Sequence, residues 1–140
     1  MRYLSIDHGE RRVGLALGDD SVPLVTPIGR IERSQGPRSE DHLIDALLRA
    51  VREHAADAIV IGLPLNMDGS EGPAAQASRR LGEQLGPRCG LVIHYQDERL
   101  TSFAADQAMN QSGRTHKQKK KLRDALAACA ILEDFLRRVS

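Results

Sequence analysis

The sequence predicts an α/β domain in which helices cover both faces of a mixed β-sheet. The first third of the chain holds three short apolar runs in succession, and the remainder alternates between helical and strand patterns. One uninterrupted apolar run, residues 58–63, is typical of a strand that is covered on both faces. A chain of 140 residues has a common length for one domain, so we expect residues 1–140 to form a single one.

Strands are expected at residues 2–7 and 12–17, joined by a link around Gly9 that is short enough for a hairpin. A third strand is expected at about residues 28–32, which completes an antiparallel meander. The next segment is predicted to be a helix with Ser39 as its N-cap. Its apolar face is made by Leu43, Ile44, Leu47, Leu48 and Val51.

A second helix is expected from Pro73, a residue suited to the first helical position, to about residue 85. Its apolar face is made by Ala74, Ala77, Leu81 and Leu85. Residues 90–95 form the fifth strand, Thr101 caps a short helix that ends near Ser112, and the last helix covers about residues 117–138. In this order the first, fourth and fifth strands are parallel.

The composition excludes several classes of protein. Aromatic residues make up 3% of the chain, which is too few for a platform on which bases stack. Cys89 and Cys129 are too few for a disulfide scaffold or a zinc ribbon, and both are expected to behave as small buried hydrophobes. The sequence shows no signal peptide or membrane span, so we expect a cytoplasmic protein that does not bind membranes.

Carboxylates gather at one edge of the predicted sheet. The carboxyl ends of parallel strands share an edge, and ligands bind there. Asp7 ends the first strand, and Asp97 and Glu98 end the fifth. Asp124 heads a stripe of the last helix that should face the sheet, together with Ala128, Ile131 and Phe135.

Each of these carboxylates also has a simpler interpretation. Asp7 and Asp97 can be turn or cap residues, whereas Asp124 must face either a metal ion or a basic side chain such as Arg123 or Lys120. Clustered carboxylates raise one another's pKa unless a cation neutralises them. Ligation by oxygen alone favours Mg²⁺ or Mn²⁺ over Zn²⁺, and two such ions can activate water for phosphodiester cleavage.

The segment of residues 66–72 leads into a helix N-terminus, where free N–H groups and the helix dipole attract anions. Asn66 and Ser70 are therefore candidate contacts for a phosphate of a nucleic-acid strand. The alternative is a Gly-rich connection in which Asp68 or Ser70 caps the helix.

Residues 114–123 carry six basic side chains and no acid, although the net charge of the whole chain is only +1. Within this run Lys117, Lys120 and Lys121 are candidate phosphate contacts, and Lys117 and Lys121 would flank Asp124 on the same side of the helix. The alternative is that the run is only the solvated start of a helix.

Four segments, in order, resemble the YqgF family, whose members are also called RuvX-like: residues 6–16, 62–73, 97–102 and 121–128. The segment of residues 62–73 is highly specific, and the resemblance covers nearly the whole chain. It implies an RNase H-like fold with a five-stranded mixed β-sheet in the strand order 3-2-1-4-5. It also implies catalytic, metal-binding carboxylates at Asp7, Glu98 and Asp124, with Arg99 beside them as a contact to nucleic acid.

Members of this family are described as nucleases that process the 5′ end of the small-subunit ribosomal RNA precursor, with resolution of Holliday junctions as the older proposal. The resemblance therefore implies a nuclease that uses Mg²⁺ or Mn²⁺. Its expected partner is pre-rRNA, in free form or in ribosomal precursor particles, rather than branched DNA. A junction resolvase needs two active sites, and the sequence is compatible with either a monomer or a homodimer.

Two other classes of function compete with a nuclease. The pattern from Asp7 to Gly9 resembles the phosphate loop of actin-like sugar kinases and chaperone ATPases, but those proteins bind the nucleotide between two such domains and this chain supplies one. A non-catalytic RNA- or ribosome-binding adaptor would use the basic run but would gain nothing from three convergent carboxylates. A nuclease is favoured over both.

Overall fold

The computed structural model describes residues 1–98 and 116–139 of the chain. Its strands are β1 (Arg2–His8), β2 (Arg12–Asp19), β3 (Val22–Glu32), β4 (Ala58–Leu63) and β5 (Val92–Asp97). They form one sheet in the order β3-β2-β1-β4-β5. β2 is antiparallel to β1 and β3, whereas β1, β4 and β5 are parallel, so the predicted mixed sheet and its strand order are confirmed.

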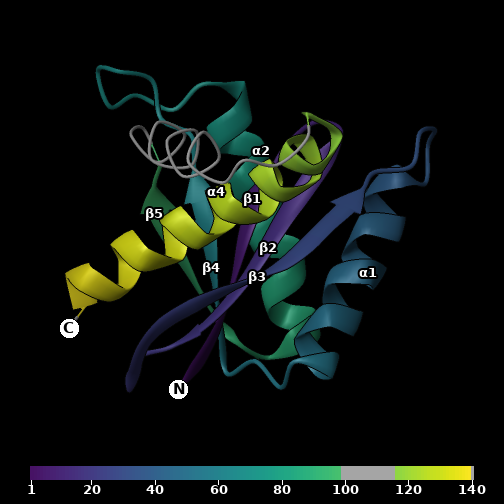
Figure 1. Ribbon diagram of the computed structural model, residues 1–140. Coiled ribbons are helices and arrows are strands. Elements are labelled where there is room, and N and C mark those ends of the chain that lie inside the picture. The colour runs from purple at the N-terminus through teal and green to yellow at the C-terminus, as the bar shows by residue number, and fades with distance from the viewer. Residues whose placement is uncertain (99–115, 140) are drawn as a thin grey trace.

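Helices cover both faces of this sheet, as predicted. α1 (Ser39–Glu53) and α2 (Pro73–Cys89) lie on one face, and α4 (His116–Val139) crosses the other (Figure 1). Successive residues of a strand point to opposite faces. In β4, Ile59 and Ile61 therefore pack with the residues of α1 and α2, whereas Ala58 and Val60 pack with those of α4.

α4 lies close to the sheet above β1 and β2. The apolar stripe predicted for it is at most 1% exposed and consists of Ala128, Ile131 and Phe135. The buried hydroxyl of Ser5 in β1 donates a hydrogen bond of 2.7 Å to the Ala128 carbonyl. Gly14 of β2 faces the same helix, and a Cβ there would come closer than 3.0 Å to the backbone oxygen of Asp124. The missing side chain of Gly14 therefore permits the close packing of α4.

The third strand begins much earlier than predicted. It starts at Val22 rather than near Ile28, although Pro27 lies within it. β3 is an edge strand, where a proline that lacks an N–H group interrupts no ladder on its outer side. Pro27 pairs with Ala16, and the register shifts next to this pair. Prolines were thus a misleading signal for a strand boundary at the edge of the sheet.

Two details of the helices also differ from the prediction. Ser39 is the first residue of α1 rather than its N-cap, which is Arg38 without a capping side-chain hydrogen bond. α2 continues beyond residue 85 to Cys89 and ends at Gly90, whose φ of 73° is the left-handed conformation that glycine favours. β5 consequently starts at Val92 instead of residue 90.

The buried face of α2 is rotated relative to the predicted one. Ala74 is exposed, and the face consists of Ala75, Ser78, Leu81, Gly82 and Leu85. Gly82 faces the sheet, where the side chain of Tyr95 of β5 occupies the space that a Cβ on residue 82 would need. Of the two cysteines, Cys129 is buried as predicted, but Cys89 is only half-buried. The short helix expected after Thr101 lies outside the described residues.

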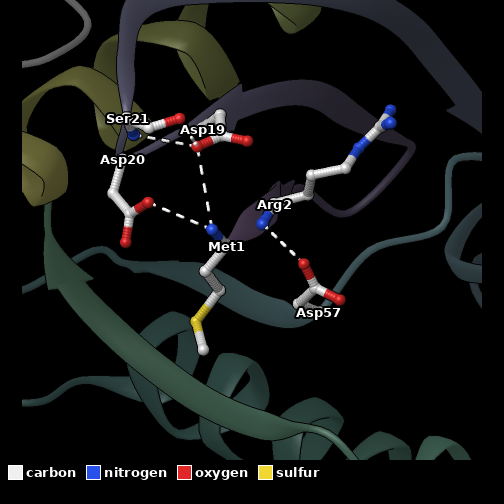
Figure 2. A network of polar contacts seen from close by, with 6 residues as sticks. All are labelled: Met1, Arg2, Asp19, Asp20, Ser21 and Asp57. Atoms are coloured by element: carbon white, nitrogen blue, oxygen red, sulfur yellow. Dashed lines mark hydrogen bonds and ion pairs between the residues drawn. The ribbon is translucent and has the colours of Figure 1, made fainter.

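Polar contacts join the chain terminus to the turn between β2 and β3 (Figure 2). The Met1 ammonium group lies 3.1 Å from Asp20 Oδ1 and 3.7 Å from Asp19 Oδ1. Asp19 Oδ1 also accepts hydrogen bonds from the Ser21 hydroxyl and N–H groups, which lower the pKa of Asp19 to about 2. These contacts fix the end of the sheet that lies opposite the carboxyl end of β1. None of the helices within residues 1–98 and 116–139 is long and apolar enough to cross a membrane.

We expect Gly14→Ala to destabilise the protein by about 1–3 kcal/mol, because the new methyl group must push α4 away from β2. Urea denaturation followed by circular dichroism measures this loss. Gly86→Ala, inside α2, is the matched control, because its new Cβ would lie 3.3 Å from Ile93 Cγ1 and would meet only a side chain at that distance. It should change the stability by less than about 1 kcal/mol. Equal effects of the two substitutions would show that the approach of α4 is not limited by Gly14.

A candidate active site at the carboxyl end of the sheet

One row of residues crosses the sheet at the carboxyl end of β1, on the face that α4 covers. Gly14 of β2 pairs with Asp7 of β1 on one side and with Arg30 of β3 on the other. Beyond Asp7, Gly62 of β4 occupies the next register position of the parallel pair. Asp7 therefore lies between two positions that have no side chain.

Glu98 fills the space above Gly62. Its backbone N–H donates to the Leu63 carbonyl at 3.2 Å, which holds the residue at the end of β4. A Cβ on Gly62 would come closer than 3.0 Å to Glu98 Oε2. The side chains of Glu98 and Asp7 are joined by a hydrogen bond. Two carboxyl groups can form such a bond only if one of them keeps its proton.

Burial is the main reason why the pKa of both carboxyl groups is elevated. It raises the pKa of Asp7 to about 6, while the hydrogen bond from Glu98 lowers it and the charge of Asp124 raises it. Burial, followed by the charge and the hydrogen bond of Asp7, raises the pKa of Glu98 to about 8. At neutral pH the pair therefore holds one proton, which Asp7 and Glu98 share. A cation that binds both groups must displace this proton.

Asp124 of α4 approaches the same row above Gly14. Its Oδ2 lies 3.4 Å from Arg12 Nε and 3.4 Å from Arg30 Nη1. Arg12 precedes Gly14 by two residues on β2, so both face α4, and Arg30 is the neighbour of Gly14 on β3. Asp124 thus faces basic side chains, which was one of the two alternatives from the sequence, and Arg12 and Arg30 are the partners seen among the described residues.

The arginine partners of Asp124 are functional candidates that sequence reasoning missed. Arg12 lies within the first segment that resembles the YqgF family, and its position two residues from Gly14 was the available signal. Arg30 gave no signal, because its place beside Gly14 depends on the pairing of β2 with β3. That pairing was obscured by the prolines of β3.

The predicted phosphate contacts at residues 66–70 lie in a closed loop. The Asn66 amide donates to the Ser70 hydroxyl at 2.9 Å, and that hydroxyl donates to Asp68 at 2.6 Å. The N-cap of α2 is Gly72, which makes no side-chain cap, so the alternative in which Asp68 or Ser70 caps the helix is wrong. Binding of phosphate by Asn66 and Ser70 stays a prediction.

The other predicted contacts to nucleic acid cannot be placed at the site. Arg99 lies outside the described residues. Lys117, Lys120 and Lys121 belong to the first turns of α4, but their side chains lie outside the described part of the chain. Their roles stay predictions.

The donor chemistry of the Asp7–Glu98 pair fits a hard divalent cation. Both groups offer only oxygen ligands, and in the absence of a cation a shared proton joins them. Within residues 1–98 and 116–139, however, no three His, Cys, Asp or Glu side chains are grouped so that they could hold one ion. Asp124 is engaged with Arg12 and Arg30 instead. Its role as a third metal ligand therefore stays a prediction.

A family profile described as "RuvX: Holliday junction resolvase" matches residues 1–138. The chain belongs to the RuvX family. A RuvX relative from Anaeromyxobacter sp. (strain Fw109-5), named "Putative pre-16S rRNA nuclease", is 35% identical and covers 97% of this chain and 96% of its own length. Another of the same name, from Oenococcus oeni (strain ATCC BAA-331 / PSU-1), is 38% identical and covers 97% and 94%. The resemblance seen in the four segments is confirmed.

A solved structure, that of Thermus thermophilus RuvC in complex with a Holliday junction substrate, is similar to this RuvX protein with a TM-score of 0.64. The similarity covers 100% of this chain and 97% of that chain, at 14% sequence identity. At this identity the likeness concerns the fold alone, and it confirms the RNase H-like fold that the resemblance implied.

The raised pKa values predict how the stability of the metal-free protein depends on pH. A carboxyl group whose pKa is raised on folding stabilises the protein below the ordinary pKa, and this stabilisation is lost as the pH rises through the raised value. Between pH 5 and pH 9 the melting temperature in EDTA should therefore fall by roughly 5–10 °C through the Asp7–Glu98 pair. Glu98→Gln keeps a neutral donor to Asp7 and should flatten the curve. If the melting temperatures of the wild type and Glu98→Gln change with pH in the same way, the pair does not share a proton.

Asp124→Asn should destabilise the metal-free protein by about 1 kcal/mol, because Arg12 and Arg30 lose the charge between them and the site is partly exposed. Thermal melts in EDTA measure the loss. Asp134→Asn is the matched control, because Asp134 lies on the same helix and pairs with the exposed Arg137. It should have almost no effect. If Asp124→Asn does not lower the melting temperature, the repulsion between Asp124 and Asp7 offsets the attraction of the arginines.

Proposed function

We propose that this RuvX protein is a divalent-metal-dependent nuclease that hydrolyses phosphodiester bonds at the carboxyl edge of its sheet. The observation that carries the proposal is the buried Asp7–Glu98 pair, in which a shared proton stands where a cation would neutralise the charge. We further propose that its substrate is the 5′ end of the 16S rRNA precursor, processed in the cytoplasm. The shared name of the curated relatives supports this substrate.

Bound Mg²⁺ or Mn²⁺ would supply charge neutralisation and an activated water molecule. Asp7 and Glu98 would hold the ion, and the pair would release its shared proton on binding. The two contacts of Asp124 to arginine, at 3.4 Å, are longer than the 2.7–2.9 Å of strong charge-assisted bonds, which allows Asp124 to join the ion as a third ligand. Arg12 and Arg30 would then lie beside the site as counter-charges for phosphate oxygens.

The strand itself would be held by groups around this edge. We propose Asn66, Ser70 and Arg99 as contacts near the strand ends, and Lys117, Lys120 and Lys121 as contacts at the start of α4. Phosphate contacts of this kind position a strand without reading its sequence. They suit an enzyme that acts at one place in a large RNA, where the surrounding particle supplies the specificity.

Cleavage of branched DNA is the second candidate, favoured by the description of the RuvX family as Holliday junction resolvases. The deciding experiment incubates the purified protein with Mg²⁺ or Mn²⁺, and with EDTA, on three matched substrates. These are an RNA that spans the 5′ end of the 16S precursor, duplex DNA and a four-way junction. Preferential cleavage of the RNA supports our proposal, and symmetric cleavage of the junction by a dimer supports the second candidate.

Asp7→Asn and Glu98→Gln should each reduce cleavage by about a hundredfold or more, because each removes a charge that the cation requires at nearly constant shape. Asp97→Asn, which alters the neighbouring carboxylate on β5, should retain most of the activity. Metal-induced stabilisation of the fold, measured by thermal melts, should disappear in the first two variants and persist in the third. Full activity of Glu98→Gln would exclude Glu98 from the reaction.

A further inference from the structure

A second concave site lies on the other face of the sheet, at the same edge. It is a pocket of about 300 Å³ lined by His8, Arg33, Glu40, Ala77, Arg80 and Gln84. His8 follows Asp7 directly in β1, so their side chains leave the sheet on opposite faces. The volume is at the lower end of the range for pockets that bind small ligands. No part of the proposed nuclease chemistry uses this pocket.

The inner wall of the pocket is a fixed guanidinium group. Arg33, whose side chain is 15% exposed, donates at 2.6 Å to Glu40 and at 3.1 Å to the Gly9 carbonyl. The same group lies 3.1 Å from His8 Nε2. Because a guanidinium can only donate, Nε2 must accept and the proton of a neutral His8 is on Nδ1. The charge of Glu40 is thus neutralised by Arg33. The contacts of Arg33 with Glu40, Gly9 and His8 hold the side chains of this wall in place.

The outer wall carries a positive charge that no acid balances within the described part of the chain. Ala77, Arg80 and Gln84 occupy positions i, i+3 and i+7 of α2 and share one face of the helix. Arg80 makes no hydrogen bond or ion pair with the residues described. Its neighbour Arg79 is committed elsewhere, with Glu71 at 2.6 and 2.7 Å and the Tyr95 ring at 5.0 Å. The small side chain of Ala77 leaves the space between the walls open.

We propose that this pocket binds a phosphate group of a nucleic-acid strand that passes over the edge of the sheet to reach Asp7. The Arg80 guanidinium group, the Gln84 amide and the His8 imidazole offer donors, and the one acid in the lining, Glu40, is already paired with Arg33. This arrangement suits a phosphate, which accepts several hydrogen bonds and is matched by arginine geometry. The assignment to a strand rests on the proposed nuclease function, whereas the binding of phosphate itself does not.

The test measures binding in EDTA, where no cleavage occurs. Inorganic phosphate is titrated against the full chain, and the melting temperature is followed at constant ionic strength with chloride as the control. We expect saturable stabilisation of the wild type. Arg80→Ala removes the unbalanced charge and Ala77→Leu fills the pocket, so each should weaken phosphate binding by about tenfold or more. If Ala77→Leu does not fold, Arg80→Ala and the controls still decide the question.

The matched controls lie on the same helix. Arg88→Ala removes an exposed arginine, and Ala74→Leu adds the same bulk at an exposed position outside the pocket. Both should bind phosphate as the wild type does. Absence of saturable binding by the wild type overturns the proposal, as does wild-type binding by both Arg80→Ala and Ala77→Leu. An equal loss in the controls also overturns it.

A second titration identifies the source of the phosphate. Two oligoribonucleotides of one sequence, with a 5′-phosphate or a 5′-hydroxyl group, are compared on the wild type and Arg80→Ala. Tighter binding of the phosphorylated oligonucleotide, lost in Arg80→Ala, assigns the pocket to a terminal phosphate. Equal binding of the two, weakened in Arg80→Ala, assigns it to an internal phosphodiester. Oligonucleotide binding that Arg80→Ala leaves unchanged overturns the assignment to a strand. These outcomes are independent of whether the protein cleaves RNA.

Discussion

Gly14 and Gly62 flank Asp7 on the two neighbouring strands, and the space that their side chains would occupy is taken by other parts of the site. The backbone of Asp124 lies over Gly14, and the carboxyl group of Glu98 lies over Gly62. With larger residues at these positions, α4 and the side chain of Glu98 would be displaced from the sheet. The strand register places both glycines beside Asp7, so the sheet pairing and the arrangement of the carboxylates depend on each other.

The charges at this edge are balanced from two different sources. On one side of Asp7, a proton shared with Glu98 reduces the repulsion, and on the other side Arg12 and Arg30 face Asp124. These two kinds of balance respond differently to conditions. The proton is lost as the pH rises, whereas arginine keeps its charge at every pH at which the protein is folded. The pH therefore adjusts the charge of the Asp7–Glu98 pair.

The sequence was sufficient to predict those features that depend on periodicity along the chain. Alternation in the strands and the apolar stripe of α4 predicted which faces are covered, and the strand ends predicted the place of Asp7 at the carboxyl end of β1. Features that depend on pairing between strands were not accessible. Arg30 comes next to Asp124 only through the register of β2 with β3, and no pattern within residues 22–32 reports that register. The inward rotation of Gly82 depends likewise on Tyr95, which is distant in sequence.

The irregular course of β3 has a consequence for how copies of the protein behave in a crowded solution. An exposed strand with a straight, unbroken row of N–H and C=O groups recruits strands of other molecules and starts aggregation. β3 interrupts that row with Pro27, with shifts of register and with Gly29 at a φ of 149°. It therefore offers a poor template for a neighbour. The irregularities of β3 thus protect the folded chain from pairing with strands of other molecules.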